Sequence, residues 1–283
     1  MGDSQFRNQG TVVGRLDGTN FKSEVGRNGI GNLTLNADGD KIQIALWGRE
    51  DGSTKDFLDT LEKGTKYEAR GNIDMRKDDE NTYVSVQPYN TDGVARTEKE
   101  EDAVALLSGD VFDWDLKYND NGEPEGEIQL LVFNTYNRDG DDDLTRVDVL
   151  INELESQIEY INENYEDKST KGYEKTLEDL QEDGSVMNVI DKYKELMQNT
   201  KMRFFNIDHL RINAEGDVAE RMVNEGVAIG DNISLGATIM NRMVQDRFGM
   251  VKGREQGLNA EVFYQVNESN GADVEDDGEE DLW

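Results

Sequence analysis

Residues 42–73 read IQIALWGREDGSTKDFLDTLEKGTKYEARGNI, and this stretch decides the fold of the first part of the chain. Its first six residues alternate aliphatic side chains with others, which is the period of a β-strand with one buried face. A helix is predicted next, because apolar residues follow Ser53 at helical spacing and Gly64 supplies a stop. The residues after Gly64 have the pattern of a second strand. The stretch therefore predicts strand, helix and strand in that order.

The sequence on both sides of this stretch extends the pattern. Upstream, FRNQGTVVGRL (6–16) is rich in β-branched residues around two glycines, and GNLTLN (31–36) is joined to KIQIALWG (41–48) by the tight turn ADGD. Downstream, NTYVSVQPY (81–89) has the pattern of another strand. Three strands, a helix and two strands is the order of an OB-fold barrel, so an OB-fold domain is predicted over residues 1–90.

The spacing of the punctuating residues resembles that of bacterial-type single-stranded DNA-binding proteins. The shared features are an aromatic residue and Gly at a strand end, a Lys-Gly pair ending a helix, and an Asn-Gly turn in GRNGIGNLTLN (26–36). The family also ends in an acidic tail with a hydrophobic tip, and DDGEEDLW (276–283) is similar. The chain departs from the family where Lys41 and the region of Asp78 replace its usual tryptophans, and its tip is Leu282 and Trp283 instead of Ile, Pro and Phe.

The second half of the chain has the same order of elements in a weaker form. Residues 91–104 are polar and are predicted to be a linker. Residues 105–118, 126–137 and 144–151 resemble strands, residues 152–200 a helical region, and residues 201–213 another strand. We expect a second OB-like domain over residues 105–267 with an acidic helical insertion at about 150–200, although residues 214–267 show no clean period. The expected fold class is mainly β with a helical insertion (α+β), followed by a disordered acidic tail at 268–283.

Composition limits the possible functions. The formal net charge is -32, but residues 1–95 contain 12 basic and 16 acidic residues and are nearly balanced. The acid is concentrated in residues 141–200, with 17 acidic and 6 basic residues, and in residues 268–283, with eight acidic residues and no basic one. Cys 0 excludes disulfides, thiolate metal sites and cysteine nucleophiles. Neither a bilayer-spanning apolar run nor a signal peptide is present in the sequence, so a soluble cytoplasmic protein is expected.

The resemblance implies a face that binds single-stranded DNA, which needs aromatic rings for bases and cations for phosphates. The candidates for this face are Trp47, Lys41, Arg49, Phe21, Lys22, Arg15, Arg27, Tyr83, Tyr89 and Arg7. Strand alternation puts Lys41 and Trp47 on the side opposite Ile42 and Ile44. The alternative for Trp47 is a core or dimer contact, and for Tyr83 a structural role.

The resemblance also assigns a role to the C-terminal tip. The tail candidates for binding a partner protein are Asp276, Asp277, Glu279, Glu280, Asp281, Leu282 and Trp283. Two apolar residues at an acidic end fit an apolar pocket with a basic rim. The alternative is a tail that only solubilises.

Other motifs point away from an enzyme. GRNGIG precedes a strand and not a helix, so it is interpreted as a turn. TYNRDGDDDLTR (135–146) has the wrong first and twelfth residues for a calcium loop. His209 is the only histidine and is interpreted as structural. We expect no enzyme activity, cofactor or metal, although a nuclease that uses only carboxylates to hold a metal is an alternative.

The leading hypothesis is a phage-like single-stranded DNA-binding protein of replication, recombination and repair. Its partners would be single-stranded DNA and, through the tail, replication or repair proteins, with no membrane and with homo-oligomerisation possible. The alternative is an acidic DNA mimic or scaffold that binds proteins instead of DNA.

Overall fold

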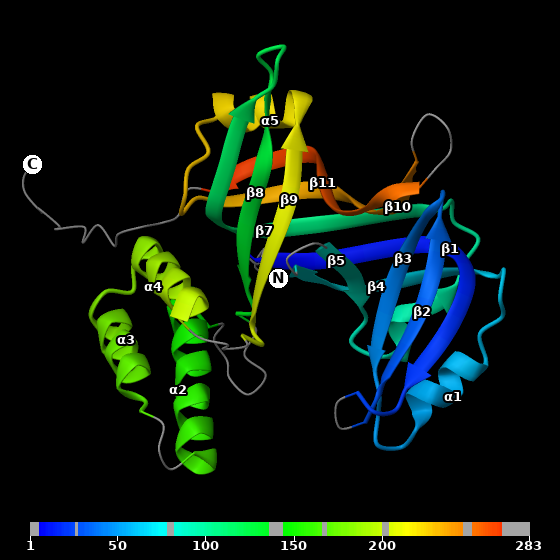
Figure 1. The fold of residues 1–283 in the computed structure, drawn as a ribbon, viewed down its shortest axis with the longest axis horizontal. Helices are drawn as coiled ribbons and strands as arrows, with labels where there is room; N and C mark the ends of the chain where they lie inside the picture. The colour runs from blue at the N-terminus through cyan, green and yellow to red at the C-terminus, as the bar shows by residue number, and fades with distance from the viewer. Residues whose placement is uncertain are drawn as a thin grey trace, which may run out of the picture.

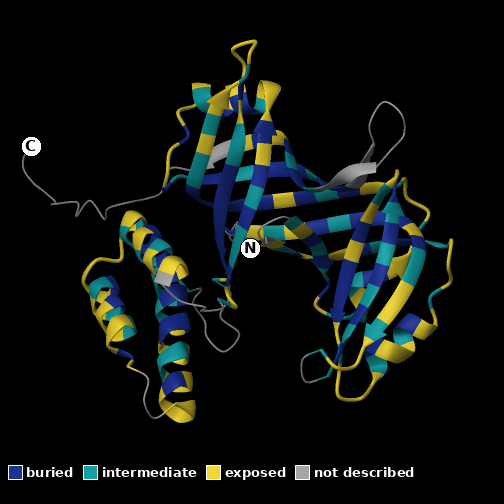
Figure 2. Cartoon of the chain, viewed as in Figure 1, coloured by how far each residue is buried: buried dark blue, intermediate teal, exposed yellow. Residues whose placement is uncertain are grey.

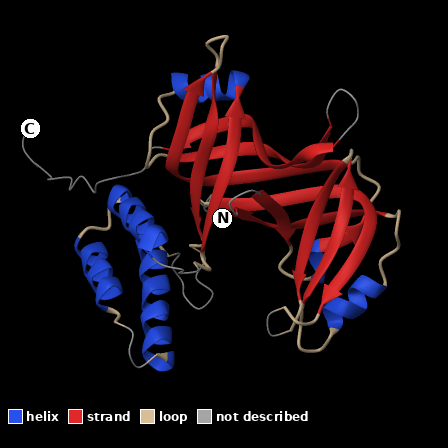
Figure 3. Cartoon of the chain, in the orientation of Figure 1, coloured by secondary structure: helices blue, strands red, loops and turns tan. Residues whose placement is uncertain are grey.

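The computed structural model describes residues 6–25, 28–77, 82–135, 144–165, 169–199, 204–245 and 251–267. Two β-barrels lie side by side in one continuous sheet, and a group of helices lies beside the second barrel (Figures 1 and 3). The sheet order is β10-β11-β9-β8-β7-β1-β2-β3-β5-β4-β6, with additional pairings of β10 with β7 and of β1 with β4 that close the barrels. The expected class, mainly β with a helical insertion, is confirmed.

The first barrel has the predicted order of elements. It contains β1 (Arg7–Lys22), β2 (Ile30–Ala37), β3 (Asp40–Trp47), α1 (Ser53–Asp59), β4 (Lys66–Lys77) and β5 (Thr82–Gln87). β1, β2 and β3 pair antiparallel, β3 pairs with β5 in parallel, and β4 pairs with both β5 and β1. The turn between β2 and β3 has positive φ at Asp38 and Gly39, as a tight hairpin requires. This pairing is that of a closed OB-fold.

The second barrel repeats this topology. It contains β7 (Asp102–Tyr118), β8 (Pro124–Phe133), β9 (Ile207–Glu215), α5 (Gly216–Asn224), β10 (Asn232–Gln245) and β11 (Val251–Asn267). β7, β8 and β9 pair antiparallel, β9 pairs with β11 in parallel, and β10 pairs with both β11 and β7. The residues after position 214, to which the sequence assigned no element, form α5 and the last two strands.

Three helices form the insertion between β8 and β9. They are α2 (Arg146–Asn164), α3 (Lys171–Glu182) and α4 (Val186–Asn199). The strand expected at 144–151 was wrong, because α2 begins there. Thr145 accepts a hydrogen bond from the Asp148 backbone N–H, and the Asp148 carboxylate accepts one from the Thr145 backbone, which is a capping box. The apolar residues after it, including Val149 and Leu150, are buried on one side of a helix.

The linker predicted at 91–104 is instead part of the sheet. β6 (Val94–Arg96) follows the short helix η1 (Thr91–Gly93) and pairs with β4, and β7 begins at Asp102. β7 then pairs antiparallel with residues 7–13 of β1, so the two barrels share backbone hydrogen bonds along their common edge.

Side chains also join the barrels. The Asn8 side chain donates to the carbonyl of Ile73 in β4 and to the Asp208 carboxylate in β9, both at 2.8 Å. Asn241 in β10 donates its backbone N–H to Asp40 Oδ1 at 2.8 Å and its side-chain amide to the Lys41 carbonyl at 2.6 Å. Buried apolar residues of both barrels form one continuous cluster (Figure 2). The barrels therefore hold a defined position relative to each other.

Candidate nucleic-acid interface

The outer face of β1, β2 and β3 gathers several of the predicted residues. At one end, cross-strand pairing places Arg15 beside Asn36 and Asn36 beside Lys41. At the other end, Ile30 lies between Lys22 and Trp47 in the same way. Because paired residues in adjacent strands point to the same side of a sheet, these side chains share one face. Lys41, Gln43 and Trp47 of β3 are exposed, while Ile42, Ile44 and Leu46 are buried, as the alternation predicted.

Strand β5 adds a second aromatic ring to this face. Gln43 of β3 pairs with Ser85 of β5, and Tyr83 lies two residues from Ser85 on the same side. The side chains of Trp47 and Tyr83 are each 50% exposed. Both rings therefore lie outside the buried core, while a contact of Trp47 with another chain and a structural role of Tyr83 stay alternatives.

A groove of about 230 Å³ lies on this face beside the Tyr83 ring and is lined by residues of β2, β3, β4 and β5. Its polar lining comes from Asn32 of β2, Gln43 of β3, Asp74 and Arg76 of β4, and Tyr83, Ser85 and Gln87 of β5. Gln43 donates to Asn32 at 3.0 Å. Amide and hydroxyl groups of this kind can hydrogen-bond base edges, and the tyrosine ring can stack on a base. The chemistry of the groove thus suits an unpaired nucleotide.

Three cations of this face are paired with carboxylates. Lys41 lies 2.7 Å from Asp17, Arg15 lies 3.0 Å from Glu101, and Arg76 lies 3.1 Å from Asp74. The basic partners are more than half exposed, so each pair contributes little stability. The side-chain hydrogen bond from Lys41 lowers the pKa of the Asp17 carboxyl. A phosphate group would compete with these carboxylates.

Some predicted residues lie elsewhere. Phe21 pairs with Gly31 on the inner side of β1 and packs against the core, so it does not belong to the outer face. Arg7 lies at the other end of β1, beside Ser108 of β7. Tyr89 follows β5 and is 83% exposed, and Arg49 is exposed in the turn after β3.

Two groups of predicted residues cannot be placed. Arg27 and the tail residues Asp276 to Trp283 lie outside the described residues, as does most of the segment tested for a calcium loop.

Sequence reasoning did not select Arg76, Asn32 or Gln87 for the site. The β4–β5 pairing brings Arg76 and Gln87 to the groove, because Arg76 lies opposite Tyr83 and Gln87 lies opposite Asn72. The β2–β3 pairing brings Asn32 there. The local signal that pointed to this face was the alternation in residues 41–47, which says nothing of β4.

Asp110 and His209 are ionisable groups of the second barrel whose pKa values are shifted by burial. Asp110 is fully buried, accepts a hydrogen bond from Asn232 at 2.9 Å, and lies 3.4 Å from Arg146. Burial raises its pKa to about 6, although Arg146 opposes the shift. His209 bonds Gln129 at 2.8 Å, and burial lowers its pKa to about 4. His209 thus has a side-chain partner in Gln129, and its structural role stays a prediction.

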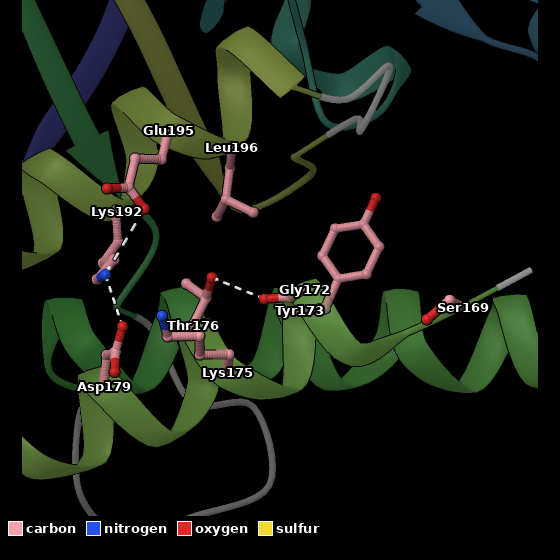
Figure 4. Close-up of a pocket in the computed structure, with 9 residues that line it drawn as sticks. All are labelled: Ser169, Gly172, Tyr173, Lys175, Thr176, Asp179, Lys192, Glu195 and Leu196. Carbon is pink, nitrogen blue, oxygen red and sulfur yellow. Dashed lines mark hydrogen bonds and ion pairs between the residues drawn. The ribbon is translucent and has the colours of Figure 1, made fainter.

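A second hollow, of about 410 Å³, lies between α3 and α4 (Figure 4). Lys192 faces Asp179 at 2.7 Å and Glu195 at 3.6 Å, and Thr176 donates to the Gly172 carbonyl at 3.0 Å. Lys192, Asp179 and Glu195 are therefore paired with each other. Among the described residues, no group of three or more histidine or acidic side chains is arranged to hold a metal ion, and no helix is apolar and long enough to cross a membrane.

The fold has known counterparts. A crystal structure of the wild-type single-stranded DNA-binding protein from Thermus aquaticus is 15% identical, with a TM-score of 0.51, and the match covers 94% of this chain and 96% of that chain. The likeness is one of fold. A deletion mutant of the same Thermus aquaticus protein is 17% identical, with a TM-score of 0.51 and coverage of 95% and 98%. No protein-family model matches the sequence, and no curated protein is similar to it.

Proposed function

We propose that this chain binds single-stranded DNA on the outer face of its first barrel. The observation that carries the proposal is one outer face that holds the half-exposed Trp47 ring, a groove lined by the half-exposed Tyr83 ring, and the cations Lys22, Lys41 and Arg15. Rings stack on bases of any sequence, and cations beside them bind the backbone. The fold shared with the Thermus aquaticus protein supports the same function.

On binding, DNA would replace the carboxylates that now pair with the cations of this face. Bases stack on Trp47 and Tyr83, and phosphates replace Asp17 and Glu101 as partners of Lys41 and Arg15. Stacking needs unpaired bases, which favours single strands over a duplex. The chain acts as a binding protein of replication, recombination or repair, and no enzyme step is needed for this role.

The tail at Asp276 to Trp283 would bind partner proteins. Its sequence joins five carboxylates to Leu282 and Trp283, which suits an apolar pocket with a basic rim. Because the tail also competes with phosphates for the cations of the first barrel, deleting it is expected to tighten DNA binding at low salt and to remove capture of replication proteins. Equal DNA binding and equal capture by both forms would contradict this role.

The decisive experiment is a titration of the full chain with poly(dT) and with duplex DNA at two salt concentrations. We expect tighter binding to poly(dT), with affinity falling as salt rises. Equal binding of both forms, or none at low salt, would contradict the proposal. It would favour the acidic DNA mimic, for which the 17 acidic residues of positions 141–200 are the supporting observation.

A further inference from the structure

The corresponding face of the second barrel is closed. By topology β8 and β9 match β2 and β3, so their outer face is the counterpart of the groove face. Three successive outer residues of β8 are buried: Gln129 is 8% exposed, Leu131 is 0% exposed and Phe133 is 1% exposed. The inner face of the same strand is buried as well, at Ile128 and Leu130. One side of β8 fills the barrel, and the other side must be covered by another part of the chain.

Helix α4 of the insertion supplies part of this cover (Figure 1). Tyr193 is 2% exposed and meets Phe112 edge-on at 5.7 Å and His209 at 6.1 Å between ring centroids. Lys194 Nζ lies 5.0 Å from the centroid of the Phe112 ring. His209 in turn bonds Gln129 of β8. The Tyr193 ring and the Lys194 ammonium of the chain itself thus occupy the kind of position that a stacked base and a backbone phosphate would need on this face.

Helix α2 fixes the insertion at both ends. Where the middle of β7 pairs with the end of β8, Arg146 lies 3.4 Å from buried Asp110 and 5.5 Å from the Phe6 ring centroid. Before β9, the buried Glu153 Oε1 accepts hydrogen bonds from the backbone N–H groups of Phe205 and Asn206 at 2.9 and 2.7 Å. Leaving such buried polar groups without partners is unfavourable, so the insertion resists displacement.

The part of this face that stays open is acidic. Glu125 of β8 lies opposite Glu215 of β9, and both are exposed. Arg211, the cation of these two strands, is already paired with Glu127 at 2.9 Å. Glu261 of β11 is also exposed, two residues after Asn259, which pairs with β9. Carboxylates at these positions repel phosphates.

We propose that the helical insertion is the permanent intramolecular occupant of the second barrel, so that each chain binds single-stranded DNA through its first barrel alone. The inference rests on the proposed function and assigns that function to one of two barrels with the same topology. The second barrel then serves to hold the insertion and to brace the first barrel through the β1–β7 pairing.

Hydrogen–deuterium exchange of the full chain, with and without saturating oligo(dT), tests the inference. We expect added protection in residues 30–47 and 82–87, and unchanged exchange in residues 186–199 and 207–215. Faster exchange in α4 on DNA binding would show that the insertion moves aside. New protection in β8 or β9 would show that the second barrel binds DNA. Either result overturns the inference while leaving the proposed function intact.

Paired variants give an independent readout. The double variant Trp47→Ala, Tyr83→Ala is expected to lose at least about 25-fold in affinity, since each stacking ring accounts for roughly 5- to 150-fold. The control is Tyr118→Ala, Tyr264→Ala, which removes rings of the second barrel that are 61% and 54% exposed, and should change affinity less than about twofold. A tenfold loss in the control, or binding within threefold of wild type in the first variant, would overturn the inference. A wild-type chain that binds no oligo(dT) at low salt overturns both proposals.

Discussion

Removing the ring of Trp47 tests the groove face most directly. The Trp47→Ala variant deletes a half-exposed ring on the outer side of β3, beside Ile30 and clear of the aliphatic core. Loss of one stacking ring weakens binding by about 1–3 kcal/mol, or roughly 5- to 150-fold. Full burial of a large apolar side chain stabilises a protein by about 1.5–3 kcal/mol, so a half-exposed ring should contribute about half of that.

The assay is fluorescence anisotropy of a labelled oligo(dT), with urea unfolding measured on the same samples. Tyr118→Ala is the matched control, because that ring is similarly exposed on the second barrel. Tryptophan quenching adds a second signal. The chain has three tryptophans, Trp47, Trp114 and Trp283, so most of the DNA-induced quenching should disappear in Trp47→Phe.

The opposite pattern would refute the reasoning. A Trp47→Ala variant that binds DNA as tightly as wild type, but loses more than about 3 kcal/mol of unfolding free energy, would assign the ring to packing. An unchanged affinity together with a change in oligomeric state would assign it to a contact between chains.

Two further predictions concern charge. Asp74→Asn frees Arg76 from its 3.1 Å ion pair and should tighten oligo(dT) binding by about two- to fivefold, and unchanged affinity would place Arg76 off the DNA path. The second prediction is that Asp110 and His209 have opposite effects on how folding stability changes in acid. Burial raises the pKa of Asp110 from 3.8 to about 6, so its stabilisation is complete below pH 3.8 and is lost as pH rises through 6. Burial lowers the pKa of His209 from 6.5 to about 4, so its stabilisation is complete above pH 6.5 and is lost as pH falls through 4. Each shift corresponds to about 3 kcal/mol. Between pH 4 and 6.5, urea unfolding should show that stability rises with pH in Asp110→Asn, which keeps His209, and falls with pH in His209→Gln, which keeps Asp110. Parallel profiles in the two variants would contradict the assignment of these pKa shifts.

Local periodicity was enough to predict the first barrel. The alternation in residues 42–47, the Asp38–Gly39 turn and the glycine after α1 each specify one element without help from distant residues. The same alternation predicted that Lys41 and Trp47 share the exposed side of β3.

The rest of the fold depends on pairings that carry no local signal. Residues 91–104 look like a linker because β6 has only three residues, and its partner β4 lies about 30 residues earlier. β10 and β11 were not predicted because bulges between Ser234 and Leu235 and between Gly236 and Ala237 break the period of two. At the site, Tyr83 and Arg76 reach the groove only through the β3–β5 and β4–β5 pairings.

The ion pairs of the groove face bear on how salt should affect binding. Each phosphate that a protein cation neutralises releases condensed cations from a single strand, which contributes a slope of about -0.7 to log K against log salt. Lys41 must leave Asp17 to bind a phosphate, and the displaced carboxylate stays on the protein and attracts cations from solution, which offsets part of this release. The measured slope should therefore be smaller in magnitude than the number of phosphate contacts suggests, and stacking on Trp47 and Tyr83 should dominate the affinity. The Asp17→Asn variant removes this offset, so it should steepen the slope by up to about 0.7 and raise affinity at low salt. An affinity gain without a steeper slope would mean that Asp17 acts by long-range repulsion and not as the partner that the phosphate replaces.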